Sequence, residues 1–209
     1  MDDFDDWQFR RDFHAEMGGS ISLAFSKQQL FYIRENFESA IAGLERLGQH
    51  AQNRPVQLRI QFEAYFLALY ACLEFITISV CDDLAETLRL PIAYNHLRGN
   101  TAFDKAWAYF KLVESQRTLN ATTVQSFGRY HIVRNAIAHG VGVSNLVGER
   151  RKLISQLSGL ISDPEDDSIG ISLAFCTAFY DFADGYLDEL EGIFKDYGDR
   201  LKFKAKSVT

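Results

Sequence analysis

Proline is scarce in this sequence. Only three prolines, Pro55, Pro91 and Pro164, occur among 209 residues. Because proline removes a backbone donor and clashes with the preceding helical turn, their scarcity leaves long stretches free of helix breakers. Hydrophobic residues make up 47% of the chain, which is ample material for one core. We therefore expect one all-α domain, a bundle of about five main helices.

Cysteine is also sparse, and no pair has the spacing of a metal or redox motif. Cys72, Cys81 and Cys176 are an odd number with no CxxC among them. They predict neither a disulfide framework nor a zinc site, and they fit a reducing compartment. The acidic start, residues 1–6, is unlike a signal or transit peptide. We expect a cytoplasmic protein.

The sequence lacks both a basic excess and the common catalytic or cofactor motifs. Its 22 Lys and Arg against 28 Asp and Glu give a net charge of −6, so any contact with nucleic acid must be local or assisted by a partner. There is no GxSxG, P-loop or HExxH motif. The pairs Asp82–Asp83 and Asp166–Asp167 lack the spacing of a metal site. We expect neither a metal nor a cofactor.

One apolar run raises the question of a membrane span. Residues 64–81 carry a single charge, Glu74, and are close to the minimum length of a transmembrane helix. A carboxylate at mid-span costs about 2.5 to 3.5 kcal/mol on insertion scales. No Lys or Arg stands beside either end as an anchor. A buried central helix is the better prediction.

The spacing of apolar residues predicts two long helices first. Steps of three and four run from Ser26, the expected N-cap, to Gln49, through Leu30, Ile33, Phe37, Ile41, Leu44 and Leu47. Pro55 suits the first turn of a second helix that ends before Pro91. We expect residues 1–25 to form an N-terminal arm and residues 26–200 the helical domain.

The second predicted helix is apolar on two sides. Its first stripe comprises Phe62, Tyr65, Leu69, Leu73, Ile76, Val80 and Leu84, and its opposite side Ala64, Ala68, Ala71, Phe75 and Ile78. A helix that is apolar all round is buried on all sides. We therefore expect either a central position in the bundle or a partner subunit that covers one face.

Two further helices have recognisable ends. Thr101 and Asp104 resemble a capping box, with Asp in place of Glu, at the start of a short helix. Asn120 can cap the next helix, which is expected to run to His139 and to stop at Gly140.

The rest of the chain is expected to hold a loop and one last long helix. A short helical stretch is predicted to begin at residues 150–152, followed by an acidic loop over 163–167. Ser172 can cap the last helix, whose stripe comprises Cys176, Phe179, Ala183, Tyr186, Leu190, Ile193 and Tyr197. Residues 201–209 are expected to be a frayed basic tail.

Residues 127–140, FGRYHIVRNAIAHG, gather two arginines and two histidines near one helix end. At about 100° per residue, Asn135 and His139 lie about 40° apart and can converge on one ligand. Arg134 lies about 140° from His139, but its long side chain can curl toward the same face. The exposed carbonyls of the last turn favour a protonated imidazole.

Arg134, Asn135 and His139, followed by Gly140, resemble the Arg-x(4–6)-His motif of HEPN superfamily ribonucleases, in which a polar residue follows the arginine. The predicted order of helices also resembles that family over about residues 26–200. The resemblance implies a metal-independent RNA endonuclease with catalytic residues Arg134, His139 and Asn135. It further implies a homodimer in which two motifs share one cleft. Relatives serve as toxins of toxin–antitoxin pairs or as antiviral effectors, so an antitoxin or a defence-system protein is an expected partner.

The residue types suit RNA cleavage. RNA carries a 2′-OH beside the scissile phosphate. A histidine can remove that proton or protonate the leaving 5′-oxygen, because its ordinary pKa lies near working pH. An arginine can neutralise charge in the transition state, and Asn135 can orient the histidine or the phosphate.

Other residues have two interpretations each. Glu74 could pair with Arg134 or Arg129, as an acidic residue facing the motif does in many HEPN proteins, or form a structural salt bridge at a helix seam. His131 and Arg129 are either rim residues that touch RNA or structural residues. The basic triplet Arg150, Arg151 and Lys152 is either a phosphate contact or a solvated face.

Two departures from the family, the acidic net charge of −6 and the lack of a tyrosine after the motif, and two rival functions stay open. Some relatives carry a modified tyrosine two residues after the histidine, where this chain has Val141, so neutralisation by a bound partner is the expected control. The rivals to a ribonuclease are a non-catalytic HEPN module that binds nucleotide or protein, and an unrelated helical interaction protein.

Overall fold

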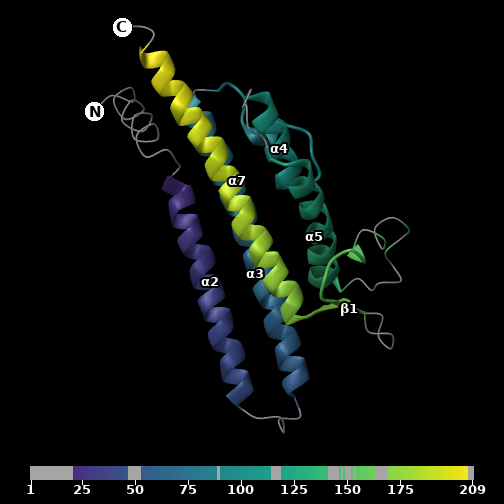
Figure 1. Cartoon of the computed structure of the whole chain (residues 1–209). Coiled ribbons are helices and arrows are strands. Elements are labelled where there is room, and N and C mark those ends of the chain that lie inside the picture. The colour runs from purple at the N-terminus through teal and green to yellow at the C-terminus, as the bar shows by residue number, and fades with distance from the viewer. Residues whose placement is uncertain are drawn as a thin grey trace. The chain divides into compact units, whose positions relative to one another are not determined.

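The computed structural model describes residues 21–46, 53–88, 90–113, 119–140, 146, 148, 152, 154–162 and 169–206. These residues form five α-helices, one 3₁₀ turn and one two-stranded sheet (Figure 1): α2 Ile21–Arg46, α3 Arg54–Leu88, η1 Tyr94–His96, α4 Ala102–Leu112, α5 Ala121–His139, β1 Leu160–Ser162, β2 Ile169–Ile171 and α7 Leu173–Lys206. The expected all-α class is confirmed for this part of the chain.

Most of the predicted helix ends are confirmed. Pro55 lies in the first turn of α3, where no intrahelical donor is needed. The side chain of Thr101 accepts from the Asp104 amide, and Asp104 accepts from the Thr101 amide, so the capping box is present. Gly140 ends α5 at φ 61°, the left-handed conformation that glycine adopts without a steric penalty. Ser172 precedes α7 and accepts from the Phe175 amide.

Two of the predicted helix ends are wrong. Helix α2 begins at Ile21, and Ser26 is not its N-cap but a buried residue inside it, 3% exposed. Leu23, seven residues before Leu30, is also buried and extends the apolar stripe toward the N-terminus. The expected frayed tail is helical as far as Lys206, and no proline interrupts α7.

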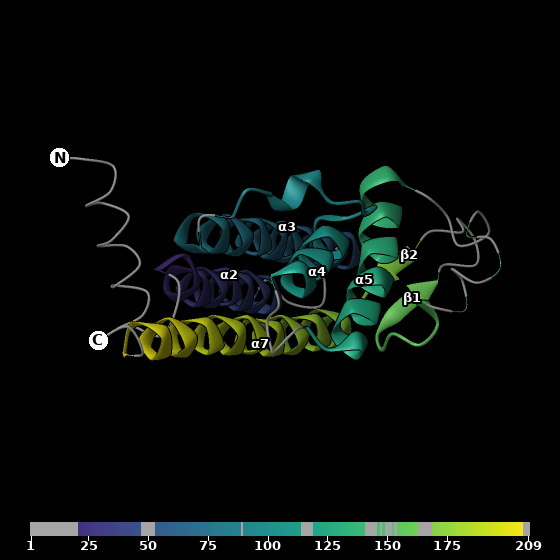
Figure 2. The same ribbon diagram turned by 90° about the horizontal axis from the view of Figure 1, so that it is seen from above.

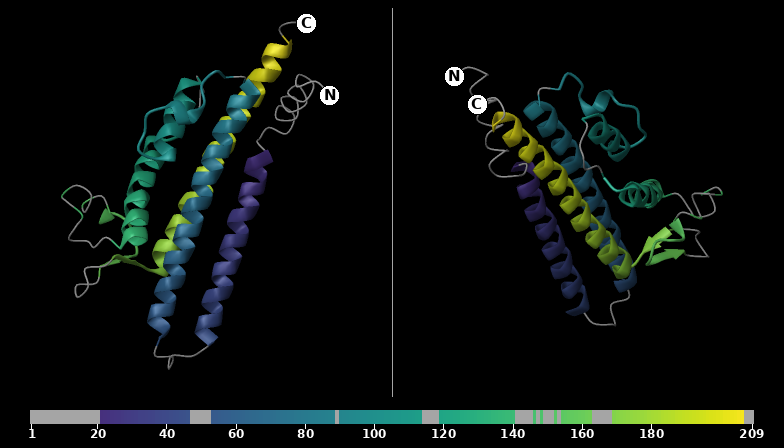
Figure 3. Two further views of the ribbon diagram at one scale, coloured as in Figure 1. Left: turned by 180° about the vertical axis from the view of Figure 1, so that it is seen from behind. Right: turned by 45° about the horizontal axis from the view of Figure 1, so that its top comes forward.

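The small sheet was not predicted. Strands β1 and β2 pair antiparallel with Leu160 opposite Ile171, and they lie beside α5 and at the N-terminal end of α7 (Figures 2 and 3). Gly159 precedes β1 at φ 79°, and its carbonyl accepts from the Ser172 amide. A Cβ on Gly159 would collide with the backbone of Phe175. Only glycine fits where the hairpin meets the start of α7. The predicted acidic loop, 163–167, lies outside the described residues.

The chain divides into two compact units, which both long helices α3 and α7 enter. One unit, here called unit 2, takes residues 29–72 and 125–183, and therefore contains most of α5. Its core is aromatic. The Phe66 ring lies 5.0 Å from that of Phe175 and 4.8 Å from that of Phe179, and the Tyr130 ring lies 4.6 Å from that of Phe179. These contacts fix one side of α5.

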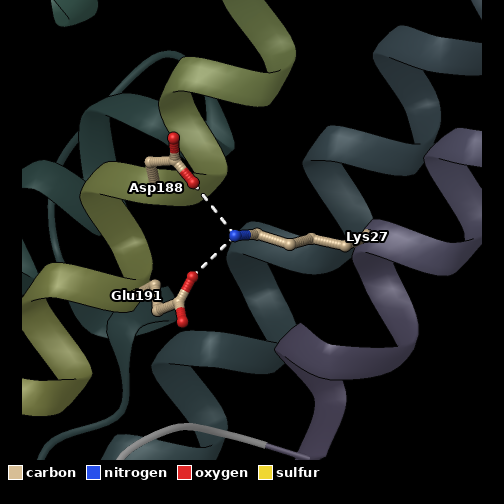
Figure 4. A network of polar contacts seen from close by, with 3 residues as sticks. All are labelled: Lys27, Asp188 and Glu191. Atoms are coloured by element: carbon tan, nitrogen blue, oxygen red, sulfur yellow. Dashed lines mark hydrogen bonds and ion pairs between the residues drawn. The ribbon is translucent and has the colours of Figure 1, made fainter.

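The other unit, unit 1, takes residues 1–28, 73–124 and 184–209. At its core the Tyr186 hydroxyl lies 2.7 Å from the Thr77 hydroxyl, and the Tyr186 ring packs edge-on against Phe103. On its surface the Lys27 ammonium donates to Asp188 and Glu191, at 2.9 and 2.6 Å (Figure 4). All three side chains are largely exposed, so this bridge contributes little stability.

Helix α3 buries one of its two apolar sides. The first stripe is buried from Tyr65 to Leu84, but the expectation that the helix is covered all round is wrong for a single chain. Ala64, Ala68, Ala71 and Phe75 are exposed, Phe75 by 63%. Coverage of this side by a partner subunit stays a prediction. Within the described residues α3 is the one helix long and apolar enough to cross a membrane, and half of its most apolar stretch is buried.

Candidate functional site

The candidate site lies on the last turns of α5. Four apolar residues spaced three apart face the core and set the rotation of this helix: Phe127, Tyr130, Val133 and Ala136. His131, Asn135 and His139 are spaced four apart and lie on the other side of the helix. The helix ends directly after His139, at Gly140. The sequence therefore places three polar side chains in one row that ends at the helix C-terminus.

A chain of hydrogen bonds links three residues of α5 to one residue of α3. The Arg134 guanidinium donates through Nη1 to Asn135 Oδ1 at 3.0 Å. Asn135 Nδ2 lies 2.9 Å from His131 Nε2, and His131 Nδ1 lies 3.0 Å from the Tyr70 hydroxyl. All four residues belong to unit 2. The curl of Arg134 toward the Asn135 face, expected from the length of its side chain, is present.

The first residue of this chain is buried and the other three are half-buried. The Tyr70 side chain is 1% exposed and packs beside Phe66 and Phe179. His131, Asn135 and Arg134 are half-buried. Tyr70 is thus held away from solvent, whereas the other three side chains, Arg134 among them, are partly accessible.

His139 lies one turn beyond Asn135 and is exposed. Residues four apart on a helix have Cβ atoms about 5–6 Å apart, so an imidazole, an amide and a guanidinium lie within reach of one phosphodiester. His139 takes no part in the hydrogen-bonded chain described above. An exposed imidazole with no fixed partner in this part of the chain is suited to proton transfer with a ligand.

The other predicted contacts have different surroundings. Arg129 is half-buried, and its Nε atom is buried with no hydrogen-bond partner among the described residues. Lys152 is exposed. Arg150 and Arg151 lie outside the described residues. Contacts of these three basic residues and Arg129 with RNA stay predictions.

Glu74 lies on α3, one turn after Tyr70, and is half-buried rather than buried. Within its own unit it makes no ion pair with a described residue. Its predicted pairing with an arginine of α5 stays a prediction, because Glu74 belongs to unit 1 and the motif to unit 2.

Sequence reasoning left His131 as either a rim residue that touches RNA or a structural residue, and it missed Tyr70. The spacing of four between His131 and Asn135 was a usable signal, since such residues are neighbours on a helix. No local sequence pattern marked Tyr70, because it lies on another helix, 61 positions before His131 in the chain. Among the described residues, no three His, Cys, Asp or Glu side chains are grouped to hold a metal ion.

Comparisons with known proteins leave the family open. No family model matches the chain, and no characterised protein or solved structure matches it. The function is therefore inferred from α5 and its contacts.

Proposed function

We propose that this protein is a metal-independent RNA endonuclease of the HEPN type, with Arg134, Asn135 and His139 as its catalytic residues. One observation carries the proposal. The Arg134 guanidinium is hydrogen-bonded to the Asn135 side chain, at a helix end where His139 is exposed one turn away. Sequence spacing alone did not fix the direction of Arg134; its contact with Asn135 turns it toward the side that His139 shares.

The chemistry assigns one task to each group. His139 removes the proton of the 2′-OH, the 2′-oxygen attacks phosphorus, and the bond from phosphorus to the 5′-oxygen breaks. Arg134 stabilises the charge that develops on the phosphoryl oxygens. The products are a 2′,3′-cyclic phosphate and a 5′-OH, and the 5′-oxygen must receive a proton from a second acid.

A second copy of the motif is the proposed source of that acid. Within one chain His131 is a poor candidate, because both of its ring nitrogens are engaged by Tyr70 and Asn135. We therefore expect a homodimer in which two α5 ends share one cleft. In the cell such an enzyme acts as a toxin or an antiphage effector, held inactive by an antitoxin or a defence-system protein.

Glu74 has a supporting role in this proposal, orienting an arginine of the motif. Because its side chain is only half-buried, Glu74→Gln should reduce RNA cleavage more than it reduces the midpoint of thermal unfolding. Unchanged cleavage in Glu74→Gln would show that Glu74 does not orient an arginine of the motif.

The test is cleavage of a single-stranded RNA by the purified protein with and without EDTA. Cleavage should survive EDTA and leave a 2′,3′-cyclic phosphate or a 3′-phosphate. The DNA of the same sequence, which lacks the 2′-OH, should stay intact. Cleavage that disappears with chelator and returns with magnesium, or that acts equally on DNA, contradicts the proposal.

A non-catalytic HEPN module that binds nucleotide or protein is the second candidate. The net charge of −6 favours it, because an acidic protein repels a long polyanion more than it repels a mononucleotide. This candidate predicts saturable binding of a mononucleotide, lost in Arg134→Ala, with no cleavage of RNA at any protein concentration.

A further inference from the structure

The hydrogen-bonded chain on α5 has only one consistent direction. Arginine has donors and no acceptor, so the Asn135 atom that faces Arg134 Nη1 must be the carbonyl oxygen. The amide nitrogen of Asn135 then faces His131 Nε2, at 2.9 Å. The reverse orientation of the amide would set its NH₂ group against the guanidinium, donor against donor.

The direction of the amide determines the state of His131. The Asn135 NH₂ group can only donate, so His131 Nε2 must accept and carries no proton. The remaining ring proton lies on Nδ1, 3.0 Å from the Tyr70 hydroxyl, which accepts it. His131 is therefore neutral and is the Nδ1–H tautomer.

We propose that His131 is a positioning residue for Arg134. Its Nε2 lone pair holds the Asn135 amide in the one orientation that presents an oxygen to the guanidinium. Tyr70, 1% exposed and packed in the aromatic core, fixes the imidazole ring in turn. A flexible arginine loses rotamer entropy when a ligand orders it, and a preformed contact removes part of that cost. The effect on RNA cleavage depends on the proposed function, whereas the tautomer does not.

The first experiment measures the tautomer directly, by ¹⁵N NMR of the wild-type protein labelled at histidine. His131 should show a protonated Nδ1 and an unprotonated Nε2, with coupling patterns of a single tautomer. His96, an exposed histidine in unit 1, is the control and should show a mixture of tautomers. An Nε2–H tautomer or an imidazolium at His131 at pH 8 would overturn the proposal.

The second experiment separates the two nitrogens by substitution. Glutamine places its terminal amide near the position of Nε2, and asparagine places it near Nδ1. His131→Gln therefore keeps an acceptor for Asn135, whereas His131→Asn keeps a donor for Tyr70 and loses that acceptor. We expect kcat for RNA cleavage to fall about tenfold or more in His131→Asn, the loss of one net hydrogen bond. It should stay within about threefold of wild type in His131→Gln, with KM nearly unchanged in both.

A purely structural role for His131 predicts a different order. If the ring only anchors α5 to Tyr70, His131→Asn should behave as wild type and His131→Gln should be the weaker variant, in stability as well as in kcat. That order would overturn the proposal. If the wild-type protein cleaves no RNA, the proposed function fails, and the NMR measurement alone then decides the state of His131.

Discussion

Each of the two units contains a buried tyrosine whose hydroxyl belongs to a group of hydrogen-bonded residues. The two groups differ in the atom at which their hydrogen bonds end. In unit 1 the Thr77 hydroxyl donates to the Leu73 carbonyl at 2.7 Å and lies 2.7 Å from the Tyr186 hydroxyl. Thr77 has a single proton, so Tyr186 donates to Thr77. This group ends on a backbone carbonyl one turn back along α3, and both hydroxyl-bearing residues are essentially unexposed.

The group in unit 2 begins in the same way and ends differently. Tyr70 is as buried as Tyr186, but the hydrogen bonds lead through His131 and Asn135 to the charged, half-buried Arg134. The group in unit 1 is closed, because its hydrogen bonds end inside the protein; such a group satisfies buried polar atoms and adds stability. The group in unit 2 is open, because it ends on a charged side chain that solvent can reach, and its hydrogen bonds restrict the movement of that side chain. The comparison predicts that substitutions in unit 1 change stability, and that substitutions at the outer end in unit 2 change activity.

The largest effect is expected at the outer end. His139→Ala should lower RNA cleavage by about 10² to 10⁴-fold, the usual contribution of a general acid or base, and Arg134→Ala should be comparably damaging. His139 is exposed, so the midpoint of thermal unfolding should stay near that of wild type. His96→Ala, at another exposed histidine, is the matched control and should cleave normally. Full cleavage by a folded His139→Ala protein would refute the assignment of the site.

The next effect is on stability alone, in unit 1. Thr77→Val conserves shape and removes the acceptor that the Tyr186 hydroxyl uses. Removing one partner of a buried hydrogen bond costs about 1 to 3 kcal/mol, so the free energy of unfolding in urea should fall by that amount. The kcat of RNA cleavage should not change. A loss of kcat in a folded Thr77→Val protein would show that the group in unit 1 also affects activity, which contradicts the comparison.

A smaller and mixed effect is expected at Tyr70, the buried end of the open group. Tyr70→Phe keeps the ring and its packing against Phe66 and Phe179 but removes the acceptor for His131 Nδ1. The free energy of unfolding should fall by about 1 kcal/mol, and kcat by a few-fold. Tyr186→Phe is the matched variant in unit 1 and should lower stability by a similar amount with no change in kcat. Equal kcat in both variants would show that the open group does not reach the site.

The smallest effect concerns the pH dependence of the core beside the motif. Burial, with a small addition from the Asp181 charge, raises the pKa of Tyr130 to about 12 despite the opposing Arg129 charge. Because the folded pKa lies above the ordinary value of 10.0, folding favours the neutral phenol. This contribution is complete below pH 10 and is lost as the pH rises through about 12. Absorbance at alkaline pH should show Tyr130 ionising late, and Tyr130→Phe should flatten the loss of stability in that range.

Local signals predicted most of the helices and the helix that carries the candidate site. The capping box at Thr101, proline in the first turn of α3 and glycine after His139 are each decided within a few residues, so they were readable from the sequence. The same holds for the row of His131, Asn135 and His139, which follows from the helical repeat. The N-cap at Ser26 was wrong because the buried Leu23 continues the helix beyond a residue that is only suited to a cap.

The sequence by itself determined that α5 ends in a polar row of one amide and two imidazoles, with Arg134 directly before the amide in the chain. Only the tertiary structure decided that Tyr70 meets His131, that Asn135 turns its oxygen to Arg134, and that one apolar side of α3 is buried while the other is exposed. Periodicity specifies which residues share a face of a helix. The partner of that face depends on contacts between segments far apart in the chain, which packing alone selects.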